Sequence, residues 1–91
     1  MDASAVDRIV SALRAGQPHR VPFYTTLFAE ADARDSVVCA CEGGGFELTT
    51  TFREHAPGPG WSIEQHETEP RTEAQLREEL RSCDEATVTP R

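Results

Sequence analysis

The sequence contains no lysine and no asparagine, so all nine of its basic residues are arginines. They stand against 16 acidic residues, which gives a net charge of -7. Non-specific nucleic-acid binding and attraction to an anionic membrane surface both need clustered positive charge. The composition therefore argues against both classes and favours a basic protein partner. A GC-rich genome or adaptation of the host to high salt would each explain the missing lysine.

Long apolar runs are also missing, since none approaches the roughly 20 residues that cross a bilayer. The first eight residues, MDASAVDR, carry acidic groups where a signal peptide has positive charge. There are only three cysteines, and without an export signal we expect reduced thiols in the cytoplasm. A chain of 91 residues has room for one core. We therefore expect a single domain over residues 1–83, followed by a loose tail over 84–91.

A triple glycine, Gly43 to Gly45, separates two runs that are rich in β-branched and aromatic residues. Glycine readily adopts the positive φ angles that a tight hairpin turn needs. In the run after the glycines, apolar and polar residues alternate from Phe46 to Arg53, as in a half-buried strand. The stretch from Ser36 to Glu54 therefore predicts a β-hairpin.

Two helices and two further strands are predicted around this hairpin. Apolar residues at helical spacing predict a helix over 4–15 with Ser4 as its N-cap. Alternating patterns predict strands over 21–30 and 61–67, the second of them ended by Pro70. Thr72 and Gln75 form a capping-box pattern at the start of a helix over 72–83. The expected fold class is α+β, with a four-stranded antiparallel meander sheet flanked by an N-terminal and a C-terminal helix.

Cys39 and Cys41 are the first candidate site, because both thiols fall on one face of a strand. Structural zinc sites take four ligands, usually in pairs spaced by two to four residues, so this spacing makes a poor chelate. His66 could help to complete a ligand set if the fold brought it close. The alternatives left open are a zinc- or thiol-based regulatory protein and two small buried side chains in a central strand.

A catalytic site has weaker support in the sequence. No serine or cysteine stands in a recognisable nucleophile motif, and the histidines fall in polar settings. A small enzyme or small-molecule binder would need a pocket in which His55 or His66 meets a carboxylate such as Glu54 or Glu64. No catalytic residue and no cofactor are predicted, with zinc as the alternative.

A binding surface is the remaining candidate. Both faces of the predicted strand 21–30 are apolar, and one thin second helix cannot cover a whole sheet. The segment Glu64 to Glu85 is also strongly acidic. The leading hypothesis is a non-catalytic protein-binding module: a small acidic inhibitor, adaptor or homodimer subunit that acts through its sheet or its acidic surface. The candidate interface residues are Trp61, Tyr24, Phe28, Arg53 and Glu78.

Overall fold

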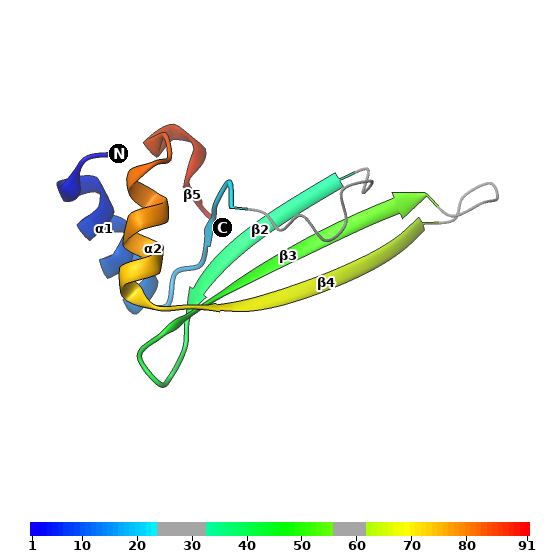
Figure 1. The fold of residues 1–91 in the computed structure, drawn as a ribbon, viewed down its shortest axis with the longest axis horizontal. Helices are drawn as coiled ribbons and strands as arrows, with labels where there is room; N and C mark the ends of the chain where they lie inside the picture. The colour runs from blue at the N-terminus through cyan, green and yellow to red at the C-terminus, as the bar shows by residue number, and fades with distance from the viewer. Residues whose placement is uncertain (24–32, 56–61) are drawn as a thin grey trace.

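The computed structural model describes residues 1–23, 33–55 and 62–91 (Figure 1). Along these residues lie α1 (Ala3–Arg14), β1 (His19–Arg20), β2 (Ala33–Ala40), β3 (Phe46–His55), β4 (Ser62–Arg71), α2 (Glu73–Arg81), a 3-10 turn η1 (Glu85–Thr87) and β5 (Thr89–Pro90). The strands form one antiparallel sheet in the order β4-β3-β2-β1-β5. The predicted α+β class with an antiparallel sheet is confirmed, with five strands in the described residues instead of four.

The predicted hairpin is present between β2 and β3. These strands pair continuously from Ala33 opposite Arg53 to Ala40 opposite Phe46. The turn closes with a hydrogen bond from the Cys41 N–H to the Gly45 carbonyl at 2.9 Å. Gly44 has φ of +92°, a left-handed conformation that a side chain would strain. One of the three glycines therefore meets the requirement that predicted this turn.

The two helices follow their predicted boundaries closely, but one cap differs. The side chain of Asp2, not that of Ser4, caps α1, and it accepts a hydrogen bond from the Ala5 N–H at 2.8 Å. Ser4 was the wrong choice because the helix begins at Ala3, so that Ser4 already lies inside its first turn. At α2 the capping box is confirmed, since the Thr72 and Gln75 side chains each accept from the other residue's backbone N–H.

Two strand predictions need correction. The first strand was expected over 21–30, but β1 covers only His19–Arg20, and residues 24–32 lie outside the described part of the chain. The last long strand was expected to end before Pro70, yet β4 continues to Arg71. Pro70 is tolerated because β4 is the outermost strand on its side of the described sheet, where a missing N–H breaks no ladder bond.

The segment expected to be a loose tail is instead part of the packed structure. Thr89 and Pro90 pair with Arg20 and His19 of β1, and the Arg91 N–H donates to the Pro18 carbonyl. Val88, between η1 and β5, is only 6% exposed. The short strand β5 can pair here because β2 occupies only one edge of β1.

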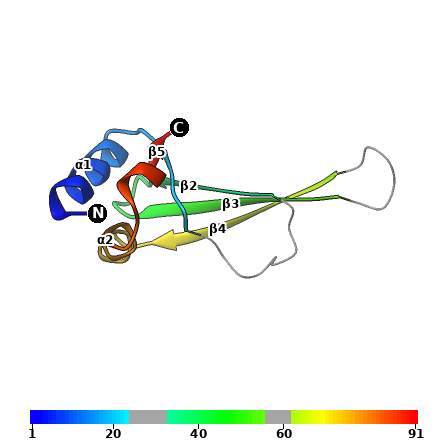
Figure 2. The same cartoon turned by 90° about the horizontal axis from the view of Figure 1, so that it is seen from above.

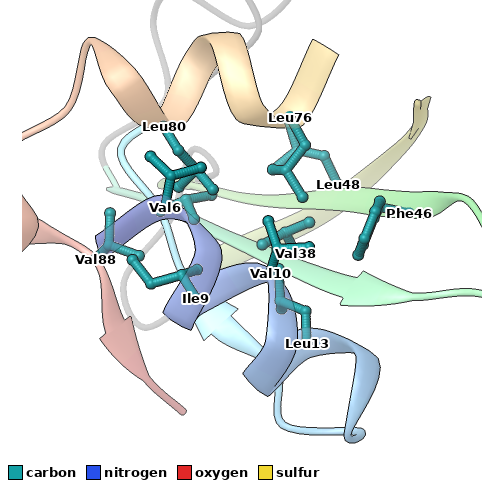
Figure 3. Close-up of a cluster of buried hydrophobic side chains, with 11 residues drawn as sticks. Val6, Ile9, Val10, Leu13, Val38, Phe46, Leu48, Leu76, Leu80 and Val88 are labelled. Atoms are coloured by element: carbon teal, nitrogen blue, oxygen red, sulfur yellow. The ribbon is translucent and has the colours of Figure 1, made fainter. Parts of the chain in front are cut away.

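The core lies between the two helices and one face of the sheet (Figure 3). In that view the apolar stripe of α1 points toward the strands, and Leu76 and Leu80 of α2 close the cluster from the other helix. The remaining core members come from the sheet and its flanks: Val21, Val38, Phe46, Leu48 and Val88. Both helices gather at one end of the sheet, and the long strands extend away from them (Figures 1 and 2).

Beyond the core cluster, the same face of the sheet carries a buried polar pair. Ser36 and Thr50 lie directly opposite each other on β2 and β3, and they are 6% and 1% exposed. Their hydroxyl oxygens are 3.2 Å apart, within hydrogen-bonding distance. Each hydroxyl thus satisfies the other inside an otherwise apolar row that ends with the buried Phe52.

Candidate functional site

Among the described residues, the second face of the sheet carries no side chain of the core cluster, although Val37 on this face is only 8% exposed. Successive side chains on a strand point to opposite faces, and directly paired residues point to the same face. The strand register therefore assigns one set of residues to the face opposite the core, which we call the open face. Its members are Arg20, Asp35, Val37, Cys39, Glu47, Thr49, Thr51, Glu64, His66 and Thr68.

Hydroxyl groups on this open face pair across β3 and β4. The hydroxyl oxygens of Thr49 and Thr68 are 3.2 Å apart. The Thr51 hydroxyl lies 3.0 Å from Nδ1 of His66, and Nε2 of the same ring lies 3.0 Å from the Glu64 carboxylate. These contacts hold the polar side chains in fixed positions, which lowers the entropy lost when a partner is bound.

His66 thus contacts a carboxylate, as the small-enzyme hypothesis required, but this contact lies on an exposed surface. Its side chain is 58% exposed. The two hollows described below are lined by neither His66 nor its two partners. General-base catalysis needs a substrate held within reach of the imidazole, and a flat, exposed strand does not provide that enclosure.

Cys39 and Cys41 lie at the hairpin end of the open face. Cys39 is directly opposite Glu47, and both Cys39 and Cys41 are half-buried. His66 pairs with Thr51, four residues farther along β3, or roughly 13 Å at the usual strand rise. Among the described residues no group of three or more His, Cys, Asp or Glu is arranged to hold a metal ion. The zinc hypothesis therefore has no ligand set in this part of the chain.

The pKa of the Cys41 thiol is raised above its ordinary value, chiefly by partial burial and then by the charge of Glu47 and by Cys39. We expect Glu47→Gln to lower this pKa, so Cys41 should react faster with iodoacetamide near pH 8 because the thiolate is the nucleophile. Peptide mass mapping separates Cys41 from the other two thiols. Glu42→Gln removes the carboxylate next to Cys41 in the chain, which is not among the causes of this raised pKa, so it is the matched control. Equal rates in both variants would contradict the assignment.

Two hollows flank Arg71, which is the last residue of β4. One of about 620 Å³ lies between the glycine turn and the start of α2, and Cys41 and Phe46 are among its lining residues. The other, of about 540 Å³, lies near Phe23 and Cys83. Arg71 is held between them by Glu79 at 2.9 Å and Glu69 at 3.0 Å. Its charge is therefore already engaged by two carboxylates.

The helical half of the acidic segment is largely neutralised within the protein. Arg77 pairs with Asp7 at 2.6 Å and with Glu73 at 3.6 Å, and Arg14 also reaches Glu73. Glu78 is 77% exposed, with Arg81 at 3.3 Å. One carboxylate oxygen on each element, Oε2 of Glu67 on β4 and Oε2 of Glu79 on α2, is buried without a hydrogen-bond partner.

The structure describes only some of the predicted interface residues. Glu78 is exposed on α2, as expected for a surface residue. Arg53 is part of β3, but its side chain lies outside the described part, and the same is true of the whole of Tyr24, Phe28 and Trp61. The sequence analysis missed Thr68 because it ended the strand at Glu67, although the alternation of carboxylates at 67 and 69 continues the pattern.

Comparisons with protein-family models, with curated proteins and with solved structures found no match to this chain. No helix in the described residues is long and apolar enough to cross a membrane.

Proposed function

We propose that this chain is a small acidic binding module that holds a basic partner protein against the open face of its sheet. The observation that carries the proposal is the division of the sheet into two unlike faces. One face carries the sheet residues of the core cluster, and the other carries half-buried or exposed polar side chains that are fixed by the contacts of Thr49, Thr51 and His66. Fixed, exposed polar groups on a rigid sheet suit recognition of another protein surface.

The charge balance favours a basic partner over self-association. Glu47 and Glu64 are exposed on the open face, and the whole chain has a net charge of -7. Two copies would bring like charges together, whereas a basic protein would be attracted and steered toward this surface. Binding is favoured over catalysis because His66 is exposed outside both hollows.

Native mass spectrometry of the full chain, purified gently from its own host, tests this proposal. We expect a complex with a second, basic polypeptide. Thr49→Arg places a positive charge in the middle of the open face and should weaken that complex at least about tenfold, which corresponds to about 1.4 kcal/mol. Ala74→Arg adds the same residue to the exposed surface of α2 and is the matched control, for which we expect less than about a twofold change.

A spectrum that contains only the free chain or a homodimer would overturn the proposal. So would a complex that Ala74→Arg disrupts and Thr49→Arg leaves intact, because that result would move the interface to the acidic helix. Far-UV circular dichroism of both variants establishes that each is folded.

A further inference from the structure

A buried histidine lies on the core side of the sheet, opposite to the open face. His19 is only 5% exposed, although the sequence indicated polar settings for the histidines. It pairs directly with Val38 of β2, a fully buried core residue, so its imidazole lies on the core side. An imidazole has a polar atom at each ring nitrogen, and a buried polar atom needs a partner.

Only one of these two nitrogens has a partner among the described residues. Nδ1 of His19 lies 3.0 Å from the backbone carbonyl oxygen of Gln17, two residues earlier in the chain. A carbonyl oxygen can only accept a hydrogen bond, so Nδ1 carries the hydrogen and Nε2 of the neutral ring carries a lone pair. Nε2 has no hydrogen bond to any described residue and is not fully enclosed by protein atoms. The ring therefore presents an oriented acceptor whose lone pair is still available.

His19 lines a hollow of about 340 Å³ between α1 and the end of the chain that carries η1 and β5. Ile9 and Ala12 line it from α1, and Val88 and Pro90 line it from the other side, so much of its wall is apolar. A cavity of roughly 150 Å³ is large enough for one benzene-sized ring. Among the described residues that line this hollow, His19 is the only buried polar one.

The two charged residues that line this hollow in the described part of the chain are paired with each other. The guanidinium of Arg8 donates a hydrogen bond to the carboxylate of Glu85, and both side chains are more than half exposed. An anion would have to compete with Glu85 for Arg8, and a metal ion would have to compete with Arg8 for Glu85. An uncharged molecule avoids both costs. The hollow therefore favours a neutral ligand that brings a hydrogen-bond donor to Nε2.

We propose that this hollow binds a small neutral molecule of one or two rings that carries a hydroxyl or ring N–H group, such as a phenol. The donor hydrogen is directed at Nε2 of His19, and the ring lies against the apolar wall. Burial of the ring supplies most of the affinity. The acceptor supplies the selectivity, because a ligand without a donor leaves Nε2 unpartnered. This site lies on the other side of the sheet from the open face, so it goes beyond the proposed function and does not depend on it.

Phenol is the probe, and the nitrogen NMR signals of the histidine rings in the full chain report its binding. We expect phenol to shift the Nε2 signal of His19 and to leave the signals of His66 in place. The dissociation constant should be on the order of 1 mM, as a ligand this small allows. Anisole is the matched control ligand, since it has the same ring but its methylated oxygen cannot donate. It should bind at least about tenfold more weakly.

Variants of the full chain, followed through their backbone amide signals, test the same contact. His19→Phe keeps a ring and removes the acceptor, so phenol should bind at least about tenfold more weakly and no better than anisole. His66→Phe makes the same change on the open face and should alter phenol binding less than about twofold. Ala12→Leu enlarges a side chain in the wall of the hollow and should weaken phenol binding. Ala74→Leu makes that change on the exposed surface of α2 and should not.

Equal binding of phenol and anisole to the unaltered chain would overturn the proposal, and this comparison does not require that His19→Phe folds. An unchanged Nε2 signal of His19 at about 10 mM phenol would also overturn it, since the hollow would then hold only water. Stronger binding of benzoate than of phenol would assign the hollow to anions instead. A shift of the same Nε2 signal with Zn²⁺ alone would assign it to a metal ion, and either result would contradict a neutral ligand.

Discussion

Replacing Phe46 with alanine is expected to lower the free energy of unfolding by about 3–5 kcal/mol. Phe46 is the first residue of β3 and is 1% exposed inside the core cluster. Alanine would leave a cavity between the sheet and the helices and would also remove the ring that lies 4.4 Å from the Arg14 guanidinium. Because small domains have a total stability of only about 5–15 kcal/mol, this change alone should bring the protein close to unfolding.

Urea denaturation followed by far-UV circular dichroism measures this loss. Thr49→Ala alters the same strand on the opposite face, where it removes one exposed hydroxyl contact, and should cost less than about 1 kcal/mol. Similar losses for the two variants would mean that the two faces of β3 are equally buried, contrary to the packing described above.

Removing residues 84–91 is expected to lower the free energy of unfolding by about 2–3 kcal/mol. The truncation exposes the apolar surface that Val88 covers, and burial of such a side chain contributes about 1.5–3 kcal/mol. It also removes the pairing of β5 with β1, which leaves His19 and Arg20 bonded on one side only.

The same denaturation measurement checks this prediction, with Thr89→Ala as the control inside the intact chain. Thr89 is exposed, so its replacement should change stability by less than about 0.5 kcal/mol. A truncated chain as stable as the full one would show that the segment contributes nothing to the fold, as a loose tail would.

Local signals in the sequence were sufficient to predict much of this fold. The apolar stripe of α1, the glycine turn and the pairing of Thr72 with Gln75 each depend on residues a few positions apart. Interactions of this range are set by backbone geometry and need no knowledge of the rest of the chain. The elements they predict are therefore present with nearly the expected boundaries.

The features that were missed depend on contacts between distant parts of the chain. Whether Pro70 ends a strand depends on which strand lies at the edge, and that is a property of the whole sheet. The pairing of Thr89 with Arg20 joins residues about 70 positions apart, so no local sequence pattern predicts it. The contact between Thr51 and His66 likewise needs the register of β3 against β4.

The buried hydroxyls of Ser36 and Thr50 have a consequence for how the hairpin chooses its alignment. A slip of two residues between β2 and β3 would keep every apolar side chain on the core face, so hydrophobicity alone does not forbid it. The slip would break the Cys41–Gly45 hydrogen bond that closes the turn. It would also separate these two hydroxyls and bury each without a partner, at about 1–3 kcal/mol apiece. This polar pair therefore supports, from inside the sheet, the same alignment that the turn sets at its end.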